Sequence, residues 1–456
     1  MMIEEQVADF VSGISYQSID EKNLHILKRN LLDSYAGICA SLRDKGMLEK
    51  FDILADFEPN EKGVNIWGIG KKASLPEAIF MNTILARRSD LLDTYMSPGK
   101  MGANHPSDNV ALVMSLADWT GRSGKDLLTY TYVSFILSCA FSDYYNPEPS
   151  GYDHDAQSVL YTPLIIGYIL GLNTEQLIEV QRMAGVFGLD INQTAMGEVT
   201  DWKHCTYASC ALRGIHIARM ALAEFKGAID IYGGEAGVSR FFPHSATMFQ
   251  KLPDLSSIVF KRWPALVFCQ TPIDVAIELS AEIESPTSID SITVETFKTA
   301  MNNAATESAY NPKSRAGRTH SIPYCVAAAL IMKTIDYTYF DDDFVGSETA
   351  IIDAMKKVKV IENSDMTEKY PDGAPCRITV RMNDGTEISK SRDFPKGDPQ
   401  DQLTDKELEN KARMNLTYVM DEKKAENIIE RIWNIESEER IDWLVEPLKR
   451  RMTDGM

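Results

Sequence analysis

Several side chains between residues 87 and 105 could exchange protons or bind an anion. Arg87, Asp90 and Thr94 have the spacing of one helical stripe, so the pattern predicts a guanidinium, a carboxylate and a hydroxyl on one face. The loop that follows carries His105, and an imidazole exchanges protons near neutral pH. These residue types favour acid–base chemistry on an anionic molecule. A solvent-exposed face of salt bridges explains the same spacing, so both interpretations stay open.

A second group begins with Thr200 and Asp201, which suit the start of a helix. Lys203 would then lie in the first helical turn, where the helix dipole disfavours a cation. Such a placement indicates an amine that exchanges protons, or one that holds an anion together with the helix N-terminus. A lysine that faces solvent and tolerates a small cost is the other explanation.

Two further groups could bind carboxylates. Lys261 and Arg262 are adjacent cations beside an aromatic side chain, and arginine binds carboxylates through two parallel hydrogen bonds. Arg315, His320 and Ser321 precede an apolar helix, and such a loop can present side chains and a helix N-terminus to an anion. Surface charge explains the first group equally well, and ordinary helix capping by Ser321 explains the second.

His154 lies between two aspartates and is a candidate base, although a single histidine in a loop is often only a surface residue. The sequence has no glycine-rich nucleotide signature and no His and Cys spacing typical of a metal site. We therefore expect neither a metal nor an organic cofactor. The chemistry would depend on side-chain acids, bases and cations.

Most of the chain is predicted to be helical. Apolar residues recur at three- and four-residue spacing through the first 250 residues. Ser74 and Glu77 resemble a capping box at the start of one helix. Buried helices are expected from Ser123 to Leu137, with Ser123 as N-cap, and from Pro163 to Leu170.

The sequence pattern changes at about residue 288. Alternating residues predict strands at 291–297 and 357–363 and a hairpin at 376–391 with Asn-Asp-Gly at its turn, and helices are expected at 322–335 and 344–357. Two amphipathic helices follow within 403–435. The pattern predicts a mainly α protein with an inserted α+β lobe: an all-helical domain of residues 1–271 with 395–456, and a smaller domain of residues 272–394.

Charge and composition exclude several classes of function. The 456 residues carry a formal net charge of −19, and no segment has the clustered Lys and Arg that nucleic acid requires. An anionic substrate would also be repelled unless a few cations gather in a concave site. The acidic start and the absence of a long apolar run predict a cytosolic protein that interacts with no membrane.

The order of these motifs resembles the MmgE/PrpD family over nearly the whole chain. The C-terminal segments PDGAPCRITVRMNDGTE and PKGDP are also similar to that family. Five motifs carry the resemblance: Asp90, Asp93 and Thr94; His105-Pro106-Ser107; Asp201-Trp202-Lys203; Lys261 with Trp263-Pro264 and Gln270-Thr271; and Arg315 with His320-Ser321-Ile322-Pro323-Tyr324.

The resemblance implies a helical lobe, a smaller α+β lobe, a cleft between them and a homodimer. Family members include 2-methylcitrate dehydratase, cis-aconitate decarboxylase and iminodisuccinate epimerase, whose reactions all lose a proton or carbon dioxide next to a carboxylate. We expect a cofactor-independent lyase that dehydrates a small hydroxy polycarboxylate such as 2-methylcitrate. A decarboxylase or epimerase on the same scaffold is the alternative, and a homologue that binds carboxylates without turnover is a further one.

Residue roles follow from the resemblance. Lys203 would stabilise the developing enediolate or act as base, and His105 would protonate the departing hydroxyl, with Asp90 orienting it or sharing protons with it. These roles could also be exchanged between the residues. His154 is a further catalytic candidate. Residues that would bind substrate are Arg87, Asp93, Thr94, Ser107, Lys261, Gln270, Arg315, His320 and Ser321.

The chain departs from the family in three places. Leu266 or Phe268 stands where the family usually has a histidine. The basic histidine that precedes the apolar helix of the family corresponds to His154, or to Tyr152 if counted otherwise. The segment Arg87-Arg88-Ser89 and the loop 95–104 also differ from the commoner form. These differences predict a pocket of altered shape.

Overall fold

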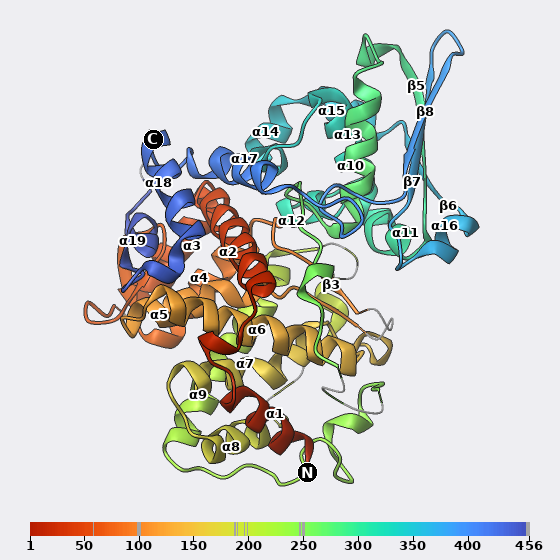
Figure 1. The fold of residues 1–456 in the computed structure, drawn as a ribbon. Coiled ribbons are helices and arrows are strands. Elements are labelled where there is room, and N and C mark those ends of the chain that lie inside the picture. Colours follow the sequence, from red (N-terminus) through yellow and green to blue (C-terminus); the bar gives the residue numbers. More distant parts are fainter. Residues whose placement is uncertain are drawn as a thin grey trace. The chain divides into compact units, whose positions relative to one another are not determined.

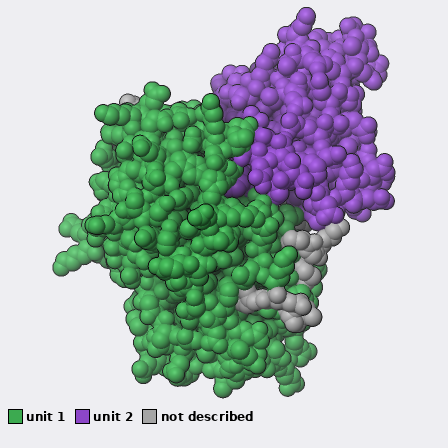
Figure 2. Space-filling model, in the orientation of Figure 1, with its two compact units in different colours: residues 1–192, 204–258, 404–456 green, residues 193–203, 259–403 purple. Residues whose placement is uncertain are grey.

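The chain forms two compact units, drawn in green and purple in Figure 2. The computed structural model describes residues 1–57, 59–97, 102–186, 188, 190–195, 197, 199–245, 248 and 251–452. Unit 1 comprises residues 1–192, 204–258 and 404–456, and unit 2 comprises residues 193–203 and 259–403. These boundaries differ from the expected ones at 271/272 and 394/395, and unit 2 also takes the short segment 193–203.

Unit 1 is built from helices, as predicted for this part of the chain (Figure 1). Helices α5, α6 and α7 are buried along almost their whole length, which fits their nearly continuous apolar sequence. The helices are α1 (Ile3–Ser12), α2 (Glu21–Ser41), α3 (Lys45–Phe57), α4 (Leu75–Arg87), α5 (Asp108–Trp119), α6 (Gly124–Tyr144), α7 (Asp155–Ile169), α8 (Thr174–Ala184), α9 (Thr206–Leu222), α17 (Asp405–Leu416), α18 (Glu422–Trp433) and α19 (Asp442–Val445).

Two short antiparallel strand pairs interrupt the helices of unit 1, and the sequence pattern gave no sign of them. Strand β1 (Val64–Ile66) pairs with β2 (Lys71–Ala73), and β3 (Tyr95–Met96) pairs with β4 (Ala103–Asn104). The second pair joins Tyr95 to Asn104, directly beside Thr94 and His105. It therefore fixes the two candidate residues near each other.

The helix starts only partly agree with the sequence. Ser123 caps α6 by accepting a hydrogen bond from the Asp126 amide, as predicted. Ser74 does precede α4, but its side chain makes no capping bond, so the capping-box prediction is wrong. Helix α7 begins at Asp155, earlier than the expected start at Pro163, and the proline lies inside the helix.

Unit 2 contains a four-stranded sheet in the order β6-β5-β7-β8. Strands β5 and β6 are parallel, whereas β7 is antiparallel to both β5 and β8. Gly385 takes a positive φ of 88° in the predicted hairpin turn, a conformation that glycine adopts without strain. The strands are β5 (Ile289–Thr296), β6 (Val358–Glu362), β7 (Cys376–Met382) and β8 (Glu387–Arg392).

Helices cover the sheet of unit 2. Helix α10 packs against α13 and contacts β7 and β8, while α13 contacts β6, and together they bury the apolar face of the sheet (Figure 1). The expected helix 344–357 is divided into α14 and α15. The helices are α10 (Val267–Ser280), α11 (Lys298–Ala304), α12 (Arg315–Thr319), α13 (Ile322–Met332), α14 (Asp342–Ser347), α15 (Thr349–Met355) and α16 (Ser364–Lys369).

The C-terminal helices belong to unit 1, where α17 packs along α2. The Lys411 ammonium on α17 lies 2.6 Å from a carboxylate oxygen of Asp33 on α2, and both side chains are buried. Within the residues that the structure describes, no helix is long and apolar enough to cross a membrane.

The Lys411→Met variant should lower the free energy of unfolding by about 3–5 kcal/mol, because it leaves the Asp33 carboxylate buried without its cation. Urea denaturation followed by circular dichroism measures this change. The matched control is Lys22→Met, whose exposed pair with Asp254 should contribute no more than about 1 kcal/mol. Equal effects of the two substitutions would contradict this account of α17.

Candidate functional site

The turn after α4 places the first group of candidate residues, but not on a helical stripe. Helix α4 ends at Arg87, and Asp90 has a positive φ of 52°, which no helical residue adopts. The predicted stripe of Arg87, Asp90 and Thr94 is therefore wrong. A tight turn and the β3–β4 pair position these side chains instead.

Arg87 lies among carboxylates. Its guanidinium contacts the Asp108 carboxylate at the start of α5 at 3.0 Å, and both side chains are buried. Burial alone would lower the pKa of Arg87, but the carboxylates of Asp108, Asp155, Asp90 and Asp153 raise it above its usual value. Arg87 thus already has an internal partner, and its main effect is to offset negative charge in this part of unit 1.

Asp93 is buried, and Ser107 satisfies one of its two carboxyl oxygens. The Ser107 hydroxyl and amide donate to Asp93 Oδ1 at 2.6 and 3.0 Å, and the Asp93 amide donates to the hydroxyl oxygen of Ser107. Oδ2 is buried and has no hydrogen-bond partner among the described residues. Burial raises the pKa of Asp93 to about 7, although the hydrogen bonds from Ser107 oppose the rise.

The imidazole of His105 is held through Nδ1. This nitrogen lies 2.5 Å from the backbone oxygen of Asp93, and a carbonyl can only accept, so Nδ1 carries the proton. Thr94 Oγ1 lies 3.3 Å from the same nitrogen. In the neutral ring the lone pair is then on Nε2. His105 is therefore oriented as a group that exchanges a proton at Nε2.

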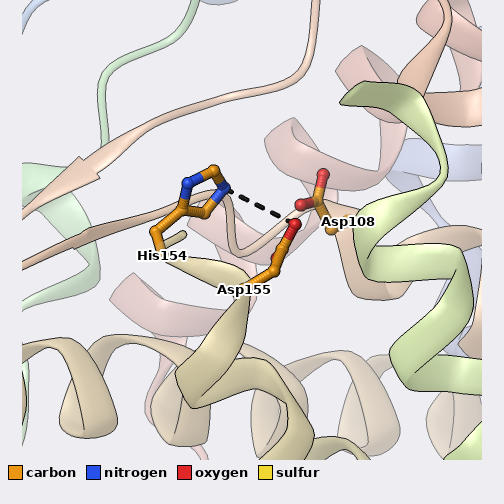
Figure 3. A group of neighbouring side chains, drawn as sticks. All are labelled: Asp108, His154 and Asp155. Atoms are coloured by element: carbon orange, nitrogen blue, oxygen red, sulfur yellow. Dashed lines mark ion pairs between the residues drawn. The ribbon is translucent and has the colours of Figure 1, made fainter. Parts of the chain in front are cut away.

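His154 lies beside His105, with the two rings edge to face and their centroids 5.1 Å apart. Its Nδ1 is 3.0 Å from Asp153, and its Nε2 is 3.7 Å from Asp155, as the dashed line in Figure 3 marks. A protonated ring would face a carboxylate at each nitrogen. The structure thus brings His154 together with His105, and only 12% of its side chain is exposed.

Asp108, His154 and Asp155 could also hold a metal ion. Their ligand atoms lie within 4.8 Å of one another, and Figure 3 shows the three side chains converging. Two of the ligands already have other partners, however. Asp108 pairs with Arg87, and Asp155 accepts a hydrogen bond of 2.6 Å from Thr206. The Arg87 guanidinium therefore supplies positive charge beside this group without a metal.

Lys203 does not lie in the first turn of a long helix. Residues Asp201–His204 form a short 3-10 helix, and α9 begins only at Thr206. The helix-dipole argument for a special role of Lys203 is therefore wrong, because the helix in which it was placed starts after it. Lys203 is buried and belongs to unit 2.

The predicted substrate-binding residues that follow Lys203 in the sequence also belong to unit 2. Three of them form hydrogen bonds or ion pairs with other residues of that unit. Gln270 bridges backbone groups of Trp263 and Ala265. Ser321 caps α13 through the Tyr324 amide. Arg315 forms an ion pair with Asp341 and donates to the Tyr337 backbone oxygen.

Lys261 and His320 are buried in unit 2 as well. His320 Nδ1 lies 2.9 Å from the Ala316 backbone oxygen, and the residue borders a cavity of about 10 Å³. Phe268, at the departure from the family, packs against Phe297 and Tyr370 with ring centroids 5.7 and 6.0 Å away. Leu266, the other residue that could stand at this position, is also partly buried, and both side chains pack against the core of unit 2.

Sequence reasoning did not select Asp108, Asp153, Asp155 or His204 as site residues. Asp108 had one local signal, since it follows Ser107 at the start of an apolar helix, and His204 follows the Asp-Trp-Lys motif. Their convergence comes from contacts between residues distant in the chain, such as Arg87 with Asp108 and Thr206 with Asp155. Spacing within one segment cannot reveal such contacts.

Asp93→Asn should flatten the pH dependence of stability. The folded pKa of about 7 exceeds the ordinary value of 3.8, so the stability that Asp93 contributes is complete below about pH 4 and is lost as pH rises through 7. The whole loss is about 4 kcal/mol, of which about 3 kcal/mol falls between pH 5 and pH 8. The variant keeps an oxygen for Ser107 and does not titrate. Urea unfolding at pH 5 and pH 8 measures the difference, and parallel changes in both proteins would contradict it.

Two family models together match most of the chain. Residues 5–249 match the MmgE/PrpD N-terminal domain, and residues 263–436 match the MmgE/PrpD C-terminal domain. The chain is 24% identical over 358 residues to the 2-methylcitrate dehydratase of Escherichia coli (strain K12), which covers 72% of each protein. It is 22% identical over 481 residues to the cis-aconitate decarboxylase of Homo sapiens, which covers 98% of this chain and 94% of the relative. The two domain matches account for most of the sequence, and the chain belongs to the MmgE/PrpD family.

Proposed function

We propose that the chain is a lyase that dehydrates a small hydroxy polycarboxylate, in the manner of a 2-methylcitrate dehydratase. The observation that carries the proposal is the orientation of His105. Its Nδ1–H group donates to the Asp93 carbonyl, so the lone pair that can accept a proton is on Nε2. His154, in edge contact, is a second proton-exchanging group. Several relatives at about 24% identity are named 2-methylcitrate dehydratases.

The reaction requires two proton movements. A base removes the proton from the carbon beside a carboxylate, the bond between the neighbouring carbon and its hydroxyl breaks, and a double bond forms between the two carbons. The hydroxyl leaves as water after accepting a proton. His105 and His154 suit these roles, because histidine exchanges protons near neutral pH and each ring is fixed by a backbone or carboxylate partner.

The negative charge that develops on the substrate needs stabilising cations. Unit 1 contributes Arg87, which is already paired with Asp108. Lys203 and Lys261 remain the further candidates and enter the proposal through their match to family motifs. The carboxylates around Arg87 would disfavour an anion, so these lysines should determine substrate affinity.

A second function has support from the extent of similarity. The match to cis-aconitate decarboxylase covers 98% of this chain, whereas the match to the Escherichia coli dehydratase covers 72%. Decarboxylation would break the bond to a carboxyl carbon in place of the bond to a hydroxyl, release carbon dioxide and then protonate the remaining carbon. The same histidines could supply that proton.

A substrate screen distinguishes the two. Chelator-treated protein is offered 2-methylcitrate, citrate and cis-aconitate, while ultraviolet absorbance reports conjugated unsaturated acids and a coupled assay reports carbon dioxide. We expect rising absorbance with 2-methylcitrate and no carbon dioxide. Carbon dioxide from cis-aconitate would favour the decarboxylase. Activity that appears only when a divalent cation is added back would instead identify Asp108, His154 and Asp155 as a metal site.

His105→Asn should lower turnover at least about 100-fold, the usual contribution of a positioned acid or base. The asparagine amide can still donate to the Asp93 carbonyl in place of Nδ1, so the fold and the loop should persist, as circular dichroism and thermal unfolding can verify. The matched control is His216→Asn, at an exposed position on α9. Near-normal turnover of His105→Asn would contradict the proposed role.

A further inference from the structure

Four side chains of unit 1 form a connected polar chain that ends at Asp90. Arg88 Nε contacts the Asp44 carboxylate at 2.7 Å, and Arg88 NH1 lies 3.3 Å from His204 Nδ1. His204 Nε2 lies 3.5 Å from Asp90 Oδ2. Arg88 and His204 are buried, with 7% and 1% of their surfaces exposed. The polar chain therefore links two other segments, at Asp44 and at His204, to the turn that begins the candidate site.

The direction of these contacts follows from the chemistry of the groups. A guanidinium can only donate, so His204 Nδ1 must be an acceptor and carries no proton. The proton of the neutral ring is then on Nε2, which faces the Asp90 carboxylate. Burial and the charges of Arg88 and Arg87 lower the pKa of His204, whereas Asp90 opposes that shift. His204 thus stays neutral, and its Nε2–H group faces the Asp90 carboxylate in an electrostatic contact of 3.5 Å that falls short of hydrogen-bond geometry.

The backbone conformation of Asp90 explains why the contact with His204 matters for the candidate site. Asp90 is in the left-handed region, which is costly for a residue with a side chain and persists only where its surroundings hold it. The turn begins directly after Arg87 and leads to Asp93, whose carbonyl orients His105. A rotation at Asp90 would displace that carbonyl. The position of the His105 ring therefore depends on how firmly Asp90 is held.

A purely structural role explains these contacts less well. Burying two charged groups and an imidazole has a desolvation cost that well-packed apolar side chains would avoid. The cost is understandable if a carboxylate must be fixed in one orientation next to reacting groups. Arg88 and His204 also lie within segments that contain the candidate residues Arg87, Asp90 and Lys203.

We propose that Arg88 and His204 are positioning residues of the active site, which act by holding the Asp90 carboxylate through the His204 Nε2–H group. The inference rests on the proposed function for its kinetic consequences. It assigns Asp90 to the orientation of the turn and His204 to the orientation of Asp90. Neither Arg88 nor His204 is required to touch the substrate.

Kinetics of four variants test the proposal, with the acid that the screen identifies as substrate. His204→Leu should lower kcat by about 10- to 100-fold with little change in KM, because misplaced groups slow the reaction more than they weaken binding. His204→Gln should retain more activity than His204→Leu, since its amide can donate to Asp90 in place of Nε2–H. The double variant His204→Leu with Asp90→Asn should be no slower than Asp90→Asn alone. Additive losses in the double variant would overturn the proposal, and His216→Gln is the matched control.

Nuclear magnetic resonance of the substrate-free protein gives a test that does not depend on turnover. In protein labelled with ¹⁵N-histidine, the His204 signal, assigned by its loss in His204→Gln, should show a neutral ring protonated at Nε2 between pH 6 and 8. A His204 ring protonated at Nδ1, or one that is positively charged in this pH range, would overturn the proposal. If the wild-type protein turns over none of the acids offered, the proposed function fails, whereas the His204 tautomer still decides the direction of the contacts.

Discussion

The positive charge of Arg87 offsets the negative charge of four carboxylates in unit 1. Asp108, Asp155, Asp90 and Asp153 all interact with it electrostatically, and a buried guanidinium is needed to offset carboxylates that have lost much of their hydration. Arg87 is the last residue of α4, and Asp108 is the first residue of α5. Their ion pair therefore closes the segment between these helices at its two ends, and that segment contains Asp93 and His105.

Within this closed segment, two groups are suited to exchange protons near neutral pH for different reasons. Asp93 reaches a pKa of about 7 because it is buried and only one of its oxygens is satisfied. His105 carries an imidazole, the side chain best suited to proton exchange near neutral pH, and the Asp93 carbonyl selects its tautomer. Groups with these properties are concentrated at functional sites. One residue, Asp93, thus contributes a titrating carboxyl group through its side chain and an orienting acceptor through its backbone.

Membership of the MmgE/PrpD family gives this site a chemical context, while the departures from the family pattern concern substrate choice. Phe268, one of the two residues that could stand at the family's histidine position, is partly buried and packs beside Phe297 and Tyr370, so a change there alters packing in unit 2. Arg88 and His204 lie next to Asp90 in a chain of polar contacts within unit 1.

The sequence by itself determined the helical character of unit 1, the strands and hairpin of unit 2, and the segments that contain Asp93, His105 and His154, because hydrophobic periodicity and turn residues are local signals. It misplaced the stripe through Arg87, Asp90 and Thr94 and the helix start at Lys203, since a left-handed residue and a 3-10 turn leave no periodic trace. Only the tertiary structure decided that Asp108, Asp155 and His204 join the site. Their contacts depend on the packing of distant helices. Burial then raised the pKa of Asp93, while the Asp93 carbonyl and the Arg88 guanidinium set the tautomers of His105 and His204.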